Sequence, residues 1–146
     1  MPIGDCGGCA GLGGCQLGLG AIVLGDQGAE VVASAPVTCP SRFEGGPGVA
    51  HGGWTAAVFD DFLGRLMMVL GKLSVTAEIS VRFERPVPVG EPLVVEAAVL
   101  GEADGDWHLA AELRLVGSGK RLGTAQGVWV ERTEAHWDPE RVRRVS

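Results

Sequence analysis

Hydrophobic residues follow two different spacings along this chain. Between Gly52 and about Leu70 they recur every third or fourth residue, the spacing of one face of an α-helix. The members of this set are Trp54, Val58, Phe59, Phe62, Leu63, Leu66, Met67 and Leu70. Gly71 and Lys72 follow, and a glycine with a basic residue often ends a helix. The pattern predicts one long amphipathic helix.

Beyond this helix the period changes to two. Apolar residues at 77, 79, 81 and 83 alternate with polar residues at 76, 78, 80 and 82 until Pro86 and Pro88, which predicts a strand. Three further strands are predicted at 92–100, 107–116 and 121–132, and a hairpin at 19–24 and 29–37. One long helix with five or six strands and short turns predicts an α+β domain in which an antiparallel sheet wraps the helix.

The length and charge of the chain limit its class. A chain of 146 residues is long enough to bury one core unaided, and we expect a single domain over 21–133. A glycine- and cysteine-rich leader (1–20) precedes it, and a solvated, frayed tail (134–146) with Arg141, Arg143 and Arg144 follows it. A net charge of −6 without a basic cluster argues against a nucleic-acid partner.

The start of the chain and its apolar runs bear on location. No apolar run approaches the roughly 20 residues of a membrane span, so we expect no membrane association. Residues 1–5 lack the basic and apolar regions of a secretory signal, so we expect a cytoplasmic protein with reduced thiols.

The cysteines raise the question of a metal. Cys6 and Cys9 have a zinc-like spacing, and Cys15 and Cys39 are possible further ligands. The four do not form two regular pairs. We therefore predict no metal site, with a structural zinc as the alternative.

The segment His51-Gly52-Gly53-Trp54 opens the predicted helix and suggests chemistry. The two glycines leave the first backbone amides of the helix sterically open, at the positive end of the helix dipole. Such amides can polarise a carbonyl or bind a developing oxyanion. A simple tight turn into the helix is an equally good interpretation, and His51 can either brace this loop or take part in chemistry.

Two acids, Asp60 and Asp61, lie within the apolar helix. An ionised carboxylate is costly to bury unless it is paired or functional. We expect Asp60 to lie nearer the apolar stripe and Asp61, about 100° further round, to be the solvated member. Asp60 could act as a general base on water or attack an acyl carbon directly.

Helix geometry separates the two candidate groups. Gly52 and Asp60 are eight residues apart, which is about 12 Å along one helix and too far for both to contact one carbonyl. If both take part, they must come from different subunits of a two-fold dimer with antiparallel helices. Thr76, at the start of the next strand, could orient a water molecule or be an ordinary strand threonine.

Taken together, these motifs resemble the hotdog-fold acyl-CoA thioesterases of the PaaI-like group. The resemblance rests on His51-Gly52-Gly53, on Asp60 nine residues after the histidine, on Thr76 sixteen residues later, and on the segment 85–90. It covers about 43–131, and the leader also looks like that of some members. A departure is Gly45, where some members have an asparagine.

The resemblance implies a fold, an assembly and an activity. The fold is the hotdog, a long central helix wrapped by an antiparallel sheet, and the assembly is a homodimer that can pair into a homotetramer. The activity is hydrolysis of an acyl-CoA thioester without a cofactor. By position, Asp60 is the base or nucleophile and Thr76 orients water, while the Gly52 amide of the facing subunit polarises the carbonyl beside His51.

Substrate contacts are less well defined. Gly53, Trp54, Arg82 and Arg85 are the candidate binding residues. Further basic candidates for the phosphates of CoA are Lys72, Lys120 and Arg121. Trp54, Phe59, Phe62 and Met67 suggest space for an apolar or aromatic acyl group. The alternatives are a non-catalytic acyl-CoA-binding module and an acyl-thioester hydratase or dehydratase.

Overall fold

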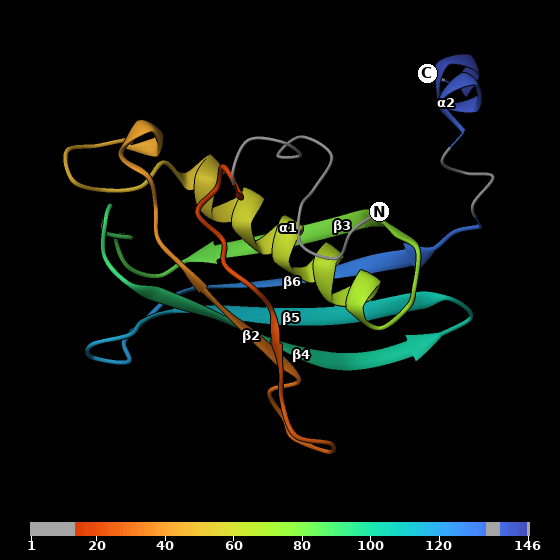
Figure 1. The fold of residues 1–146 in the computed structure, drawn as a ribbon, viewed down its shortest axis with the longest axis horizontal. Helices are drawn as coiled ribbons and strands as arrows, with labels where there is room; N and C mark the ends of the chain where they lie inside the picture. The colour runs from red at the N-terminus through yellow and green to blue at the C-terminus, as the bar shows by residue number, and fades with distance from the viewer. Residues whose placement is uncertain (1–13, 134–137, 146) are drawn as a thin grey trace.

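One helix lies across one face of a curved six-stranded sheet (Figure 1). The computed structural model describes residues 14–133 and 138–145. In chain order the elements are β1 (Val23–Leu24), β2 (Ala33–Val37), a 3-10 helix (Ser41–Phe43), α1 (Gly52–Val69), β3 (Ser74–Phe83), β4 (Leu93–Ala103), β5 (Asp106–Leu115), β6 (Arg121–Glu131) and α2 (Pro139–Val145). The prediction of one long helix with a wrapping antiparallel sheet is confirmed.

The order of strands in the sheet is β1-β2-β4-β5-β6-β3, and every pairing is antiparallel. Strand β3 follows α1 in the chain but pairs with β6 and not with its successor β4. The proline-rich segment after Phe83 therefore carries the chain across the sheet. Strand β3 ends up at an edge, and within the described residues no strand pairs with its other side.

The core lies between α1 and the sheet. Eight side chains of the helix are buried, and seven of them are the apolar residues that the spacing assigned to its inner face. They pack against alternate residues of the strands, such as Leu93 on β4, Leu113 on β5 and Ala125 on β6. Burying a large apolar side chain contributes about 1.5–3 kcal/mol. This packing fixes the rotation of the helix and so decides which residues face outward.

The ends of α1 follow the sequence signals. At its start the ring of His51 accepts a hydrogen bond from the Gly53 N–H. At its end Gly71 has a φ of 77°, a left-handed conformation that suits glycine, and the Lys72 N–H donates to the Met67 carbonyl.

The remaining elements differ in detail from those predicted from the sequence. The predicted hairpin is present as the β1–β2 pair, but its strands are shorter than its apolar runs. Strand β4 extends to Ala103, past the predicted end at 100. The expected frayed tail contains the short helix α2, in which Arg141, Arg143 and Arg144 are exposed. In the described part of the chain, no helix has both the length and the apolar character needed to cross a membrane.

Gly127 of β6 permits a close approach at the bulge in β3. A Cβ at this position would lie 2.3 Å from the Glu78 carbonyl oxygen and 2.7 Å from Cζ3 of Trp129. The ring of Trp129 thus lies directly over a residue that has no side chain. The neighbours are backbone and a buried ring, so they cannot move aside easily.

We expect Gly127→Ala to lower the free energy of unfolding by about 1–3 kcal/mol, because the new methyl group overpacks this site. Urea unfolding would measure the change. Gly101→Ala is the matched control, since a Cβ on that β4 glycine meets no atom within 4 Å and should change stability by less than about 0.5 kcal/mol. Equal effects of the two substitutions would contradict this account of Gly127.

Candidate active site

The structure brings Asp60 and Thr76 together. The Thr76 hydroxyl donates a hydrogen bond of 2.6 Å to Oδ1 of Asp60. The two residues come from the outward side of α1 and the start of β3, which pack against each other. Both residues are exposed in the single chain. The threonine therefore holds the carboxylate in one orientation, and the second oxygen accepts no hydrogen bond from the described residues.

The expectation about the two acids was wrong. Asp61 is the more buried one, with 20% of its side chain exposed, and its Oδ2 lies 2.9 Å from Nε of Arg65. Asp60 is exposed instead. The helix is rotated so that the flank with Asp60 faces β3, while the flank with Asp61 and Arg65 lies on the other side of the buried face. Burial raises the pKa of Asp61 above its usual 3.8, the charge of Arg65 opposes this shift, and the charge of Asp60 adds to it.

At the start of α1 only one of the two glycine amides is open. The Gly53 N–H donates to Nδ1 of His51 over 2.9 Å, so this amide is already used in capping the helix. The next two amides, of Trp54 and Thr55, donate to the carbonyl of His51. Within the described residues the Gly52 N–H has no acceptor. It is the free donor at the positive end of the helix.

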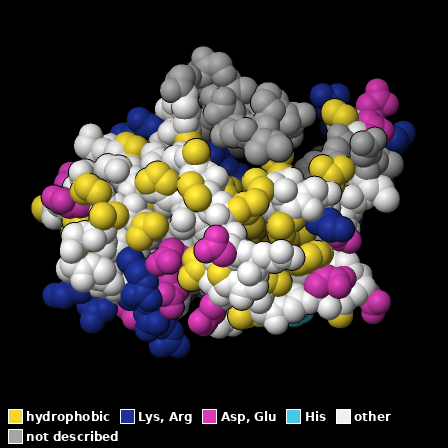
Figure 2. All heavy atoms as spheres, turned by 60° about the horizontal axis from the view of Figure 1, so that its bottom comes forward, with side chains coloured by type: hydrophobic (Ala, Val, Ile, Leu, Met, Phe, Trp, Pro, Cys, Tyr) yellow, Lys and Arg dark blue, Asp and Glu magenta, His cyan; other side chains and the backbone are white. Residues whose placement is uncertain are grey.

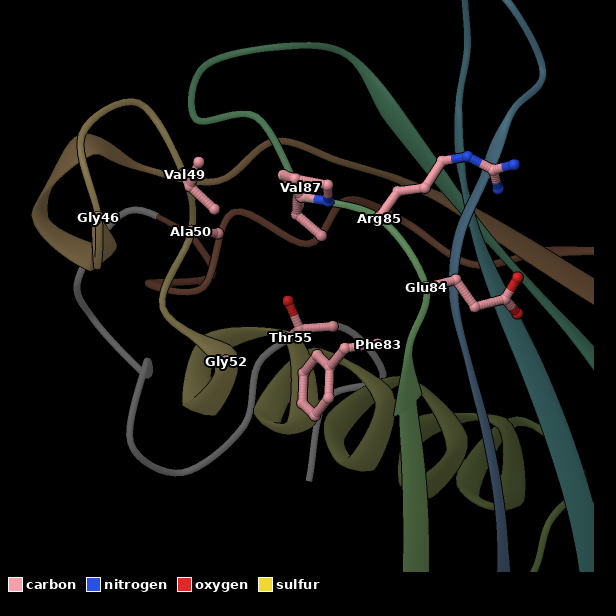
Figure 3. A pocket seen from close by; sticks show the side chains of 10 residues that line it. Gly46, Val49, Ala50, Gly52, Thr55, Phe83, Glu84, Arg85 and Val87 are labelled. Atoms are coloured by element: carbon pink, nitrogen blue, oxygen red, sulfur yellow. The ribbon is translucent and has the colours of Figure 1, made fainter.

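A cavity of about 520 Å³ lies beside this free amide. Its lining residues are Gly46, Val49, Ala50, Gly52, Thr55, Phe83, Glu84, Arg85, Pro86 and Val87. In Figure 3 the side chains of Glu84 and Arg85 extend away from the space over the helix start. The walls near Gly52 are therefore mainly apolar.

The two parts of the predicted site are separate in one chain. Gly52 lines the cavity, whereas neither Asp60 nor Thr76 does. Eight residues of helix separate Gly52 from Asp60, which corresponds to about 12 Å along the axis. One chain thus presents the Gly52 amide and the Asp60 carboxylate at two separate places.

The large apolar residues expected around an acyl group belong to the core. Trp54, Phe59, Phe62 and Met67 are at most 2% exposed, and none of them lines the cavity. The indole N–H of Trp54 donates to the Leu17 carbonyl over 2.9 Å. Among the residues that line the cavity, the aromatic one is Phe83, which is 56% exposed.

Most of the basic candidates are paired with acids or carbonyls. Arg85 lines the cavity and donates to the Arg121 carbonyl over 2.7 Å. Arg121 lies 2.9 Å from Glu84, and Lys72 lies 3.4 Å from Glu131. On the face shown in Figure 2, basic side chains gather at one end beside acidic ones. Arg82 and Lys120 are exposed.

The cysteines give no support to a metal site in the described region. Cys6 and Cys9 lie outside the described residues. Burial raises the pKa of the Cys39 thiol, which favours its protonated form over the thiolate that metals bind. Among the residues that the structure describes, no group of three or more His, Cys, Asp or Glu side chains could hold a metal ion.

Sequence reasoning missed Thr55, a polar residue on the buried side of α1. It is 1% exposed and lines the cavity three residues after Gly52. The signal was present, because Val58 and Phe59 follow it by three and four residues and place it on the apolar face.

Sequence reasoning also missed Trp129, which faces Thr76 across the β3–β6 pair. Its indole N–H is buried and has no partner in the described part of the chain. A Cβ on Gly64 would lie 4.0 Å from this nitrogen, which is an ordinary van der Waals contact, so α1 and the ring are close neighbours here. No local sequence signal identifies this neighbour, because the pairing of β3 with β6 is long-range.

Comparison with family models shows that residues 47–101 match the thioesterase superfamily. A comparison with curated protein sequences gives no match. Among solved structures, a thioesterase superfamily protein is 29% identical and has a TM-score of 0.63. The match covers 68% of this chain and 48% of that protein, so this chain spans about half of its length.

Two more solved structures have the same fold as this chain. The PaaI protein of E. coli, from the phenylacetic acid degradation operon, is 19% identical over 69% of this chain and 72% of its own, with a TM-score of 0.64. A hypothetical thioesterase of Streptococcus pneumoniae, solved with coenzyme A, is 15% identical over 77% and 92%, with a TM-score of 0.65. The hotdog fold is thereby confirmed. The pneumococcal protein was also solved with a single aspartate, or a single threonine sixteen positions further on, replaced by alanine.

The raised pKa of Asp61 predicts how stability depends on pH. A carboxyl group with a raised pKa in the folded state stabilises the protein fully only below its unfolded pKa, about 3.9, and this contribution is lost as the pH rises through the folded pKa. Asp61→Asn cannot titrate. The free energy of unfolding of the variant, minus that of the wild type, should therefore increase as the pH is raised from about 3.5 towards 7.

Urea unfolding at several pH values would measure this difference. Asp26→Asn, in an exposed turn, controls for the loss of one negative charge, and the increase for Asp61→Asn should exceed the increase for this control. A difference that stays flat or decreases with pH would contradict the assignment.

Proposed function

Since residues 47–101 match the thioesterase superfamily and the chain has the hotdog fold, we propose that it hydrolyses an acyl-CoA thioester to a free acid and CoA. The observation that carries the proposal is the 2.6 Å hydrogen bond between Thr76 and Asp60. These two residues have the same sixteen-residue spacing as the aspartate and threonine replaced in the pneumococcal protein. The Asp60 carboxylate is exposed and is held in one orientation by Thr76, as suits a carboxylate that acts on a substrate.

The chemistry assigned to Asp60 is activation of the attacking group. As a general base, it takes a proton from water while the water oxygen attacks the thioester carbon. As a nucleophile, Asp60 itself attacks that carbon, and water then hydrolyses the mixed anhydride. In either case the C–S bond breaks, and CoA leaves as a thiolate that then takes up a proton. Thr76 positions the carboxylate and, through its oxygen lone pairs, can accept a hydrogen bond from the water.

The free Gly52 N–H supplies the complementary part. In the tetrahedral intermediate the carbonyl oxygen carries a negative charge, and an amide at the positive end of a helix stabilises it. Removing one such donor typically costs about 10²–10³ in kcat. The amide must face the same carbon as Asp60, and one straight helix does not allow this.

We place the complete site between two copies of the chain. The edge strand β3 presents ten residues whose outer side lacks a partner strand within the described residues. Antiparallel pairing of two such edges would bring two α1 helices side by side in opposite directions. The Gly52 end of one helix would then lie near Asp60 of the other. The exposure of Asp60 in the single chain is in keeping with this arrangement.

Asp60→Asn should lower kcat at least about 100-fold, because the amide is neither a base nor a nucleophile. Release of free CoA from a panel of short, medium, long and aryl acyl-CoAs, followed with a thiol reagent, would measure the loss. Glu78→Gln, an exposed carboxamide substitution on β3, is the matched control and should keep most of the activity. Undiminished turnover in folded Asp60→Asn would refute the role of Asp60. Binding of acyl-CoA without any turnover by the wild type would favour a non-catalytic module.

Gly52→Pro should also abolish most activity without unfolding the helix. Proline removes the N–H but is well tolerated at the first helical position, and the extended backbone of His51 suits a residue before proline. Gly52→Ala keeps the N–H and is the control, since its Cβ would make only an ordinary 3.5 Å contact with Phe83.

Mixing the two inactive variants tests the shared site. A dimer of one Gly52→Pro chain and one Asp60→Asn chain contains one site with both groups intact. Random reassembly of equal amounts should therefore restore about a quarter of the wild-type activity. No recovery in mixtures shown to contain mixed dimers would contradict a site shared between subunits.

A further inference from the structure

The hydroxyl of Thr55 is an unused polar group inside the cavity. Thr55 is the one polar residue among the buried residues of the described chain, with 1% exposure. In helices a threonine hydroxyl commonly bonds to the carbonyl three or four residues earlier, but within the described residues the Thr55 hydroxyl has no hydrogen-bond partner. Figure 3 shows its oxygen pointing out from the helix into the space bounded by Ala50 and Val87.

The Thr55 hydroxyl is not among the unpaired polar atoms that are sealed from solvent in the described residues, so water can reach it through the cavity. A ligand that displaces such a water without replacing its hydrogen bond loses affinity. The surrounding walls, from Val49, Ala50, Val87 and Phe83, offer no acceptor through their side chains. A group that enters the cavity can satisfy the hydroxyl, and a cavity with apolar walls and a few converging polar groups is the usual form of a small-molecule site.

The position of Thr55 relative to Gly52 defines which part of a substrate it would contact. Three residues of helix separate them, which is about 4.5 Å along the axis. If Gly52 binds the thioester carbonyl oxygen, a hydroxyl almost one helical turn further on lies beside a neighbouring part of the substrate. It is placed to meet an atom further along the acyl chain, and an oxygen on the third carbon can lie at this separation.

We propose that Thr55 is a specificity-determining residue that selects acyl groups with an oxygen substituent, of the 3-hydroxyacyl class. This inference rests on the proposed thioesterase function. The apolar walls surround the carbon chain, the Gly52 amide binds the carbonyl, and the Thr55 hydroxyl exchanges a hydrogen bond with the substituent oxygen. An unsubstituted acyl chain leaves the Thr55 hydroxyl unpaired, so such a substrate gains less free energy on binding.

The test compares 3-hydroxybutyryl-CoA with butyryl-CoA, with free CoA release as the readout. The wild type should have a higher kcat/KM for the hydroxylated substrate, by about tenfold, the worth of one good hydrogen bond. In Thr55→Val the ratio of the two kcat/KM values should fall about tenfold. Thr55→Ser keeps a hydroxyl and should retain most of the preference. Thr124→Val, on the other face of the sheet, is the control and should leave the ratio unchanged.

The outcomes separate the two proposals. Hydrolysis of both substrates with the same ratio in wild type and Thr55→Val would overturn the role of Thr55 and leave the thioesterase proposal intact. Release of CoA from neither substrate, nor from any other acyl-CoA, would overturn the proposed function itself. Because the hydroxyl has no partner to lose, the melting temperature of Thr55→Val should not fall below that of the wild type, and a marked fall would show that the hydroxyl is structural.

Discussion

The apolar side of α1 is fixed against one face of the sheet, and this packing determines the rest of the molecule. Since the buried arc fixes the rotation of the helix, it also sets which residues face β3 and which face the other flank. Asp60 meets Thr76 on the β3 side, while Asp61 and Arg65 pair on the opposite side. Because the helix is straight, the same packing also sets the separation between the free amide of Gly52 and the carboxylate of Asp60. The packing that forms the core therefore also sets the positions of the candidate catalytic groups.

Local patterns in the sequence determined most of the elements but not their neighbours. The three- and four-residue spacing gave α1 to within one residue of its end, and the alternation after it gave β3. Such patterns report which side of an element is apolar. They do not report which strand lies beside it, and so the pairing of β3 with β6, which places Trp129 beside Thr76, was not predictable.

The same limit explains the error over the two acids. Adjacent helical residues differ by about 100°, and the apolar stripe has two flanks. Asp60 and Asp61 lie on different flanks, and only the tertiary structure shows that one flank is open and the other is closed over an ion pair. The sequence narrowed the candidate carboxylate to one turn of one helix. The partners of Asp60, and the available hydroxyl of Thr55, depend on contacts between distant segments.

The hydrogen bond from the Gly53 amide to His51 has a consequence for the imidazole ring. A ring nitrogen that accepts a hydrogen bond carries no proton, so in the neutral ring the proton resides on Nε2. The histidine beside the helix start is thus held in a single tautomer. It offers its surroundings a hydrogen-bond donor, and it can assist a bound carbonyl by donation while the lone pair that a base would need is committed to the helix.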